Sequence, residues 1–368
     1  MKMKRFHIAT IVATPIMLLA ACSTQSTQST QIPSSTAPST TSTSSAAAPE
    51  NNKVTLLAHD SFVVSEELVT KLKADTGIEL EVVTGGDAGS MVAGAILTAG
   101  SPTADVMFGV DNTLVSKAAN AGVFEPYTSP ELENVVTALA TDTVSGTVTP
   151  IDYGDVCVNM NEATLKAAGA TVPTSIDQLA DPALASQLVV EDPATSSPGL
   201  AFLLATINRY PDTWQEYWAK LRDGGVKVSG SWTDAYEGQY AKGRRGMVVS
   251  YATSPPAEVV YAKDPSTAKP VSTVLTDGCY RQVEYAGVLA GAANPEGAKK
   301  VVDWLLSEPV QADVPLSMFV FPARDNVELP EVFAKYAAVV SNPVQFPVAD
   351  VSLGLDQWLA QWSEVMGR

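Results

Sequence analysis

Polar and aromatic side chains recur at the ends of predicted strands, where they could bind a small ligand. They fall in five segments: His59-Asp60-Ser61-Phe62, Asp111-Asn112, Asp152-Tyr153-Gly154, Asp192 to Gly199, and Ser250 to Pro255. In open α/β sheets, ligands bind beyond the carboxyl ends of the strands. Taken singly, Asp111, Asp192 and Ser197 are explained as helix caps, and Tyr153 and Tyr251 as packed core residues. Recurrence at several strand ends favours a binding site.

The sequence offers little for catalysis. Its two histidines are His7, in the leader, and His59, so a Ser-His-Asp or Cys-His set would rest on one residue and a histidine-rich zinc site cannot be built. It contains no Gly-x-Ser-x-Gly nucleophile elbow, and we interpret Ser266 to Lys269, a Ser-x-x-Lys before Pro270, as chance. We expect no catalytic residue, metal or cofactor. A secreted hydrolase using Ser or Asp without histidine is the remote alternative.

A glycine-rich turn, Gly85 to Gly89, follows one predicted strand and precedes a helix. It lacks the Lys and Ser/Thr that complete a nucleotide-binding phosphate loop. Its backbone amides could face an anion or a polar ligand group, or the segment is simply a tight turn.

These segments belong to a predicted α/β protein whose strands are apolar runs, typical of strands buried on both faces of a mainly parallel sheet. The first region is β-α-β-α-β, with strands 54–58, 78–84 and 105–110 and helices ending near Gly77 and spanning 90–99. A second α/β region begins near Asn159, with strands 188–191, 227–229 and 247–251 and helices 200–209 and 213–222. A strand over 282–290 and a helix from Asn294 through Leu306 follow. A C-terminal helix places Leu355, Trp358, Leu359, Trp362, Val365 and Met366 on one face, which we interpret as core packing.

The N-terminus predicts export. Lys2, Lys4 and Arg5 precede an apolar run over 8–20, the layout of a secretory signal. The run ends Leu19-Ala20-Ala21-Cys22, which resembles the bacterial lipoprotein cleavage box and makes Cys22 the expected lipidation site. Residues 23–52 are rich in Ser, Thr, Gln, Pro and Ala, a composition that predicts a disordered tether. We expect the mature chain on the outer face of the cytoplasmic membrane.

Charge excludes one class of partner. The chain has 40 acidic and 23 basic side chains and a formal charge of −17. A negative surface field repels phosphate backbones, so we expect no nucleic-acid partner. The same field suits a cationic solute, although it equally well only keeps the protein soluble.

Two further cysteines, Cys157 and Cys279, remain after Cys22. Because export leads to an oxidising compartment, we predict a disulfide between them. Two separate buried thiols are the alternative.

Over residues 54–368 the chain resembles the thiamine-binding periplasmic proteins of ABC transporters, within the iron- and polyamine-binding fold group. The resemblance rests on the order and spacing of these segments: His59 to Phe62, Ala104 to Val106 through Asp111 to Leu114, Ile151 to Gly154, Asp192 to Leu200, Trp232 to Tyr236, Ser250 to Pro255, and Gln282 to Glu284.

The resemblance implies a two-lobed α/β fold of the type II periplasmic-binding-protein kind. Each lobe is then a mainly parallel sheet flanked by helices, and crossing hinge strands near 153–158 and 279–285 join them. The expected divisions are a signal peptide with lipobox (1–22), the tether (23–52), the first part of lobe 1 (53–155), lobe 2 (156–278), and a return to lobe 1 with C-terminal helices (279–368).

The resemblance also implies a clamp for thiamine, thiamine monophosphate or thiamine diphosphate. Trp232 and Tyr251 match aromatic positions that stack on the ligand rings, Asp60 and Asp111 match carboxylates near the charge, and Thr195-Ser196-Ser197 matches a loop that accepts hydroxyl or phosphate ends. Two positions depart from the family, which often has tyrosine where this chain has Ala257 and tryptophan where it has Phe319. The remaining expected ligand contacts are Ser61, Asn112, Asp152, Tyr153, Tyr236 and Ser254.

As the resemblance implies it, the protein closes two lobes around its ligand and delivers it, as a monomer, to an ABC permease powered by a separate ATPase. Iron(III), a polyamine, a sugar phosphate or a thiamine precursor are alternative ligands of the same fold. Against iron, the sequence has no Tyr-Tyr pair.

Overall fold

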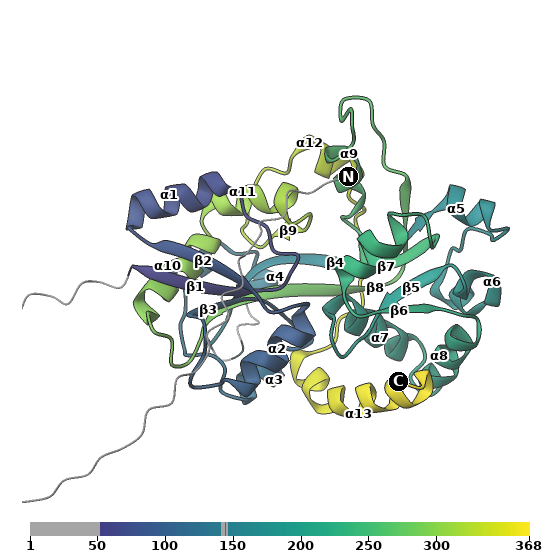
Figure 1. The fold of residues 1–368 in the computed structure, drawn as a ribbon, viewed down its shortest axis with the longest axis horizontal. Coiled ribbons are helices and arrows are strands. Elements are labelled where there is room, and N and C mark those ends of the chain that lie inside the picture. The colour runs from purple at the N-terminus through teal and green to yellow at the C-terminus, as the bar shows by residue number, and fades with distance from the viewer. Residues whose placement is uncertain (1–51, 141–143, 145) are drawn as a thin grey trace, which may run out of the picture. The chain divides into compact units, whose positions relative to one another are not determined.

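The structure, a computed structural model, describes residues 52–140, 144 and 146–368. The predicted signal peptide, Cys22 and nearly all of the tether lie outside these residues. Within them the chain forms a nine-stranded mixed sheet with the strand order β2-β1-β3-β8-β4-β7-β5-β6, and β9 pairs with β4 (Figure 1).

Lobe 1 is built on three parallel strands in the order β2-β1-β3, as the β-α-β-α-β pattern predicted. Its first elements are β1 (Lys53–Ala58), α1 (Glu66–Thr76), β2 (Glu79–Thr84), α2 (Ala88–Leu97), β3 (Val106–Asp111) and α3 (Val115–Asn120). The expectation of strands buried on both faces is wrong for β2, whose residues are exposed or only half-buried. The reason is its place at the sheet edge, where no further strand covers it.

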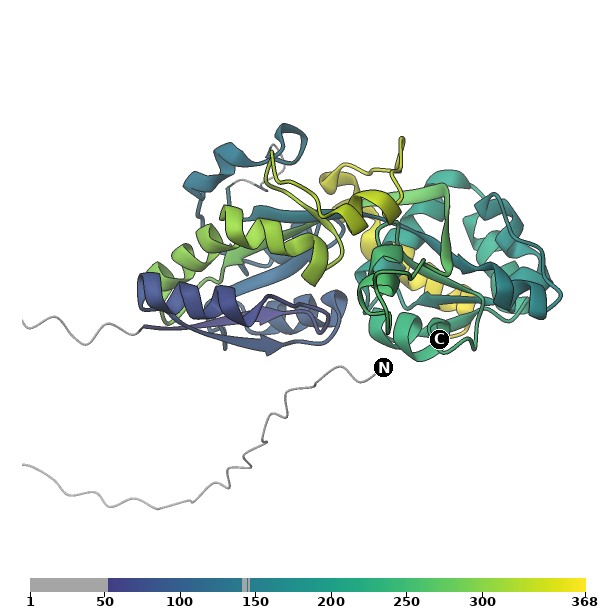
Figure 2. The ribbon, with the colours of Figure 1, turned by 90° about the horizontal axis from the view of Figure 1, so that it is seen from above.

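Short elements lead from α3 into the first of two long strands that cross between the lobes. They are η1 (Pro130–Asn134), α4 (Thr137–Ala140) and then β4 (Thr149–Asn161). The second crossing strand is β8 (Ser272–Val288), far longer than the strand predicted over 282–290. β4 and β8 are antiparallel partners, so the sheet is mixed at its centre and parallel toward its two ends. Figure 2 shows the strands that join the lobes from above.

Lobe 2 carries the parallel strands β7-β5-β6. Its predicted strands match the structure residue for residue. Its elements are α5 (Glu162–Ala167), η2 (Ile176–Ala180), α6 (Pro182–Ala185), β5 (Leu188–Glu191), α7 (Ser197–Arg209), α8 (Trp214–Asp223), β6 (Lys227–Ser229), the π-helix η3 (Asp234–Tyr240), β7 (Met247–Tyr251) and α9 (Pro255–Val260).

The chain returns to lobe 1 through α10 (Pro295–Leu305), α11 (Glu308–Ser317) and β9 (Phe321–Pro322), and ends with α12 (Glu331–Tyr336) and α13 (Val348–Met366). α13 contacts both lobes (Figure 1). On the lobe 1 side the Lys117 Nζ atom on α3 lies 2.8 Å from Asp356 Oδ1. On the lobe 2 side the rings of Trp218 and Trp362 pack edge to face with centroids 5.6 Å apart.

A bulge in β8 is fastened to β4 by a disulfide. Val158 of β4 lies opposite Leu275 and Val156 lies opposite Tyr280, so four residues of β8 stand against Cys157 alone. Cys279, in this bulge, is bonded to Cys157, with their Cα atoms 4.5 Å apart. The bond therefore joins the two crossing strands where their regular pairing is interrupted.

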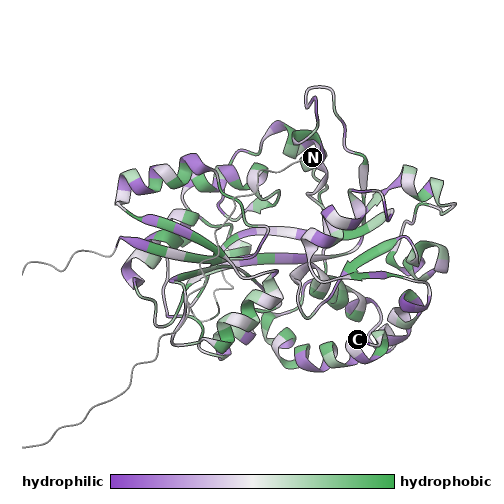
Figure 3. Ribbon diagram, in the orientation of Figure 1, coloured by the Kyte–Doolittle hydropathy of each residue, from purple (hydrophilic) through white to green (hydrophobic). Residues whose placement is uncertain are grey.

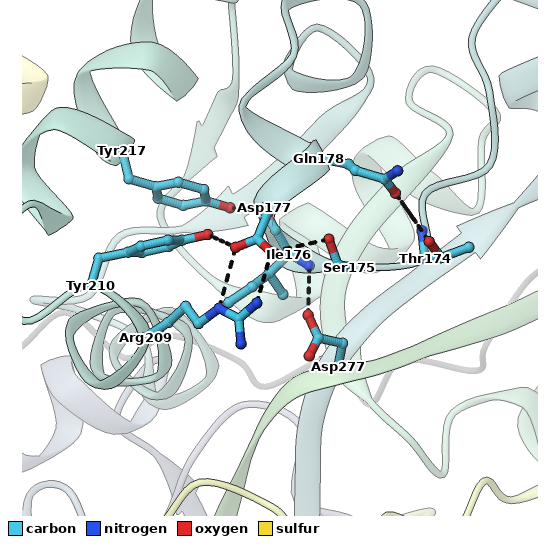
Figure 4. Close-up of polar contacts among 9 residues, drawn as sticks. All are labelled: Thr174, Ser175, Ile176, Asp177, Gln178, Arg209, Tyr210, Tyr217 and Asp277. Carbon is cyan, nitrogen blue, oxygen red and sulfur yellow. Dashed lines mark hydrogen bonds and ion pairs between the residues drawn. The ribbon is translucent and has the colours of Figure 1, made fainter.

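The turn within this bulge is held by the network drawn in Figure 4. The Asp277 carboxylate accepts the Ile176 N–H at 2.9 Å, and the carboxylate of the neighbouring Asp177 accepts from Arg209 Nη2 at 2.7 Å and from the Tyr210 hydroxyl. Gly278 has φ +73°, and a Cβ there would lie 2.7 Å from Ile176 Cγ2. The network thus ties η2 and the end of α7 to the bulge of β8.

One continuous hydrophobic core runs through both lobes, between the sheet and its helices. Figure 3 shows hydrophobic and hydrophilic residues mixed along the long crossing strands and along the helices. The predicted apolar face of α13 contributes to this core: Leu355, Trp362 and Met366 are buried, and Trp358, Leu359 and Val365 are partly buried against it.

We predict that Trp362→Ala lowers the free energy of unfolding by about 3 to 5 kcal/mol, because it leaves a large cavity beside Trp218. Leu353→Ala is the control on the same helix, since Leu353 is 86% exposed; its effect should stay within about 0.5 kcal/mol. Urea denaturation of both variants measures the difference, and equal costs would show that α13 is not anchored through Trp362.

Candidate functional site

Three carboxylates stand side by side on the three strands at the centre of the sheet. Glu284 on β8 lies opposite Asp111 of β3 on one side and opposite Asp152 of β4 on the other. Directly opposite residues of antiparallel strands project from the same face, with Cβ atoms roughly 5 Å apart. All are buried, with exposed fractions of 0% for Asp111, 1% for Asp152 and 7% for Glu284. We call Asp111, Glu284 and Asp152 the carboxylate row.

Burial shifts the titration of the row. Loss of hydration, with the charge of Glu284, raises the pKa of Asp111 to about 6, although the hydroxyls of Thr113 and Ser197 act in the opposite direction. Burial and the adjacent Glu284 raise the pKa of Asp152 well above its ordinary value. Carboxylates this close and this dry do not all ionise, so Asp152 holds its proton to a higher pH than an exposed aspartate does.

The row has few hydrogen-bond donors. Asp111 Oδ1 accepts from the Thr113 N–H at 3.1 Å and its hydroxyl at 2.7 Å, and Glu284 Oε1 faces Gln282 Nε2 at 3.3 Å. Among the described residues, no N–H or hydroxyl group donates to Asp111 Oδ2 or to either oxygen of Asp152. Such groups are costly to bury without a partner.

His59 is the basic side chain beside the row. Its Nδ1 accepts the Ser61 N–H at 3.2 Å, and its Nε2 lies 3.5 Å from Glu284 Oε1. Burial by itself lowers the pKa of His59, but the charges of Glu284, Asp87 and Asp60 raise it overall. The ring fits because residue 109 is glycine, with φ +92°: a Cβ there would lie 2.3 Å from His59 Cδ2.

The glycine-rich turn bridges the lobes above the row. Asp87 Oδ1 caps α2 through the Ala88 N–H at 2.7 Å, and Oδ2 accepts the Trp232 N–H of lobe 2 at 2.8 Å. The Ser90 N–H donates to the Thr195 carbonyl at 3.2 Å, and a Cβ on Gly89 would lie 2.7 Å from the Ala194 carbonyl oxygen. The turn therefore caps α2 and contacts lobe 2. These roles fit the interpretation of Gly85 to Gly89 as a tight turn, which is the alternative to a loop whose amides face a ligand.

Aromatic side chains from lobe 2 stand beside these groups. Trp232 stacks on Tyr236 with centroids 5.1 Å apart and ring planes at 15°, and its Nε1–H donates to Ser250 Oγ at 2.9 Å. The Ser254 hydroxyl lies 2.9 Å from that of Ser250 and so supports the same anchor. Burial raises the pKa of Tyr251 well above its ordinary value, as do the charges of Glu284, Asp87, Asp111 and Asp152 around it. Tyr251 packs against Gly154, where a Cβ would lie 2.8 Å from its Cδ1.

The structure brings many of the predicted ligand residues together. Asp111, Asp152 and Tyr251 lie in or beside the row, Ser196 and Ser197 lie next to Asp87 and Asp111 at the start of α7, and Ser61 meets Thr233 across the lobes at 3.4 Å between hydroxyl oxygens. Trp232, Tyr236 and Ser254 complete the lobe 2 side.

Other predicted residues have different partners. Asp60 is exposed beyond the strand end, although its charge reaches His59. Tyr153 follows Asp152 on β4, so its side chain projects from the opposite face of the sheet, where it stacks on Phe321 at 5.2 Å. Phe319 packs on Tyr261, with ring centroids 5.6 Å apart.

Two further predicted residues bond to the backbone. The Asn112 side chain accepts from the Val283 N–H and donates to the Arg281 carbonyl, both at 3.1 Å, so it fixes β8 beside β3. Thr195 donates its hydroxyl to the Gly230 carbonyl at 2.8 Å. For Asn112, Tyr153, Thr195 and Phe319, ligand contact stays a prediction that these partners do not support.

Sequence reasoning missed the acidic residues that complete the site, Glu284, Asp87 and Glu191. Glu191 is fully buried, and its pKa is raised well above its ordinary value by burial and by the charge of Asp87. A usable signal existed for two of them: Glu284 and Glu191 are charged residues inside apolar strands, where an unpaired carboxylate needs a functional reason.

The chain is similar in sequence and fold to known binding proteins. The family model described as bacterial extracellular solute-binding protein matches residues 101–340. The thiamine-binding periplasmic protein of Escherichia coli K12 is 29% identical over 86% of this chain and 94% of its own length, and that of Brucella melitensis is 28% identical over 88% and 94%. A solved structure described as a periplasmic thiamin binding protein superposes with a TM-score of 0.76 at 28% identity, covering 86% of this chain and 96% of that one. A ferric binding protein from Campylobacter jejuni shares the fold at 18% identity, with a TM-score of 0.66, 85% of this chain and 99% of that one.

Two lobes joined by crossing strands, with polar and aromatic side chains converging between them, define a binding protein of the type II periplasmic class. The chain belongs to the bacterial extracellular solute-binding protein family. It captures a small solute outside the cytoplasm for import by an ABC transporter and is not an enzyme.

No helix among the described residues has the length and apolar character needed to cross a membrane. The same residues contain no group of three or more His, Cys, Asp and Glu side chains placed to hold a metal ion.

We predict that Asp111→Asn stabilises the ligand-free protein at neutral pH. Between about pH 4 and pH 6 the folded protein keeps on Asp111 a proton that the unfolded chain has lost, so the free energy of unfolding falls as pH rises through that window. The amide removes this penalty and can still accept from Thr113. We expect a gain of roughly 1 to 3 kcal/mol at pH 8 and little change at pH 4.

Denaturant titrations at both pH values measure this gain. Asp212→Asn, at an exposed carboxylate between α7 and α8, is the control and should change neither value. A destabilised Asp111→Asn protein at pH 8 would mean that the buried charge has a partner in the ligand-free state.

Proposed function

We propose that the protein captures thiamine, and that the carboxylate row is the part of the site that recognises its positive charge. The observation that carries the proposal is the burial of Asp111, Glu284 and Asp152 on adjacent strands with oxygens that receive no donor. A cation placed there adds to the charge compensation, since the described protein groups offer the row one base, His59. The names of the relatives from Escherichia coli and Brucella melitensis support thiamine as that cation.

The aromatic residues suit the rings of the same ligand. Trp232 and Tyr251 come from lobe 2, and the row comes from the central strands, so a flat cation between them contacts both. A desolvated cation over an aromatic face gains roughly 2 kcal/mol. Trp232 is held in place by Ser250 and Tyr236, which lowers the entropy lost when it stacks on a ligand.

Closure of the lobes is the proposed signal to the transporter. The bonds from Asp87 to Trp232 and from Ser90 to Thr195 join lobe 1 to lobe 2 in the structure. Asp87 is near enough for its charge to act on His59 and Tyr251 beside the row, so we propose that these bonds open when a ligand enters. A ligand that contacts both lobes then shifts the population toward the closed form, which a permease can recognise.

Among thiamine forms, we propose that the unphosphorylated vitamin binds best. The groups that face Tyr251 are the carboxylates Glu284, Asp87, Asp111 and Asp152, which repel a phosphate. The hydroxyls of Ser196 and Ser197 and the N-terminus of α7 could accept a hydroxyl or phosphate end, but Asp87 and Asp111 already lie beside them.

We propose the same cellular setting that the N-terminus predicts. Cys22 carries the lipid anchor at the outer face of the cytoplasmic membrane, residues 23–52 form the tether, and a monomer delivers its ligand to a permease that a separate ATPase drives.

Isothermal titration of the ligand-stripped protein with thiamine, thiamine monophosphate and thiamine diphosphate tests the ligand. We expect one-to-one binding, tightest for thiamine. Spermidine is the competing cation, because spaced carboxylates with aromatic walls also suit a polyamine. Heat from spermidine but none from any thiamine form would replace the ligand and keep the cationic site.

Trp232→Ala should weaken thiamine binding by roughly 1 to 3 kcal/mol, about 5- to 150-fold, through loss of the stacking wall. Trp232→Phe keeps an aromatic face but loses the bond to Ser250 and should fall in between. Trp304→Ala on α10 is the matched control. Unchanged affinity in Trp232→Ala would place the ligand elsewhere.

A further inference from the structure

We propose that the carboxylate row exchanges a bound proton for its cationic ligand, so that capture releases a proton and affinity rises with pH. This inference rests on the proposed thiamine function and adds to it a thermodynamic coupling between ligand and protons.

The geometry of the row requires a compensating positive charge. Glu284 lies directly opposite both Asp111 and Asp152, and all three are buried. Like charges directly opposite on neighbouring strands repel, and the repulsion is stronger where water is excluded. In the ligand-free protein the available compensation is a proton on the row, together with the imidazole of His59, whose pKa is raised and which lies 3.5 Å from Glu284.

The groups that face the row from the surrounding elements do not neutralise it. His59, after β1, lies 3.5 Å from Glu284. Asp87, the cap of α2, adds a further negative charge nearby, and Tyr251 on β7 faces the same carboxylates as a neutral phenol, since its pKa is raised. Among the described residues that act on the row, His59 is therefore the one base, set against Asp111, Asp152, Glu284 and Asp87.

Donors from nearby residues satisfy only part of the row. Thr113 donates to one oxygen of Asp111, and Gln282 faces one oxygen of Glu284. Asp152 receives nothing from an N–H or hydroxyl of the described chain. The burial that raises the pKa of Asp152 and brings that of Asp111 to about 6 thus keeps protons on the row near neutral pH.

A permanently charged ring changes this balance. Thiamine carries a quaternary nitrogen that has no proton to donate, so it supplies charge and leaves the carboxylates as acceptors only. The favourable state of the complex is then the fully ionised row, and the proton that Asp152 held leaves to solvent. By linkage, releasing one proton makes affinity fall about tenfold for each pH unit below the pKa of the ligand-free row.

Calorimetric titration of the full-length protein with thiamine, at one pH near 7 in phosphate and in Tris, tests the exchange. These buffers differ in ionisation enthalpy, so the difference in observed heat counts the protons. We expect release of about one proton per ligand. By the same linkage the dissociation constant should rise about 10- to 100-fold between about pH 8 and pH 6, a range in which thiamine keeps its single positive charge.

Variants assign the proton. Glu284→Gln or Asp152→Asn removes one of the two interacting carboxylates and should abolish most of the buffer dependence, whereas Asp212→Asn should keep all of it. His59→Gln distinguishes the row from the imidazole: if the exchange belongs to the row, this variant still releases the proton.

The outcomes separate the two proposals. Two outcomes would overturn the exchange and leave the proposed function standing. One is thiamine binding with the same heat in both buffers, and the other is a buffer dependence that disappears only in His59→Gln. Absence of thiamine binding in every buffer overturns the proposed function and the exchange with it.

Discussion

The burial of three carboxylates on adjacent strands is the constraint on which the rest of the site depends. Asp111, Glu284 and Asp152 meet because β8 runs antiparallel between β3 and β4, and the register of both pairings puts Glu284 opposite the other two. A protein selected only for stability would place apolar or paired side chains here. Protons must therefore neutralise the row until a cation binds. Burying the carboxylates lowers the free energy of unfolding, and the cation regains that free energy when it binds.

Much of the surrounding structure keeps that row in place. Asn112 bonds to the backbone of β8 on both sides of Gln282 and so fixes the register beside β3. Arg281 pairs with Asp155 of β4 through two hydrogen bonds, at 2.5 Å and 3.2 Å, and fixes the other side. The disulfide between Cys157 and Cys279 holds β8 to β4 across its bulge. Each of these contacts resists a slip of the strand that would move Glu284 away from its neighbours.

The lobes need to separate and still return to one geometry. β4 and β8 carry the chain through the centre of the sheet, and α13 adds a connection that contacts α3 in lobe 1 and α8 in lobe 2. Its two ends are anchored differently, by an exposed ion pair at Asp356 and by the buried ring of Trp362. An exposed ion pair contributes little to stability and re-forms readily after it breaks. A buried aromatic ring contributes more to stability and does not separate from its neighbours as readily. Val351 and Leu355 of α13 are buried as well as Trp362, so the helix is packed against both lobes.

The sequence by itself determined the local features. Apolar runs marked the strands of both lobes, a glycine ended α1, the scarcity of histidine excluded the common catalytic sets, and polar residues at strand ends indicated the site, because each depends on residues near one another in the chain. Only the tertiary structure decided which carboxylates meet. Pairing of β8 with β3 and β4 joins segments far apart in the sequence, and a shift of one residue reverses which face a side chain occupies. Asp152 therefore joins the row, while its neighbour Tyr153 packs on the other face of the sheet. The role of Glu284 could not be inferred from residues near it in the sequence, because its partners Asp111 and Asp152 lie on other strands.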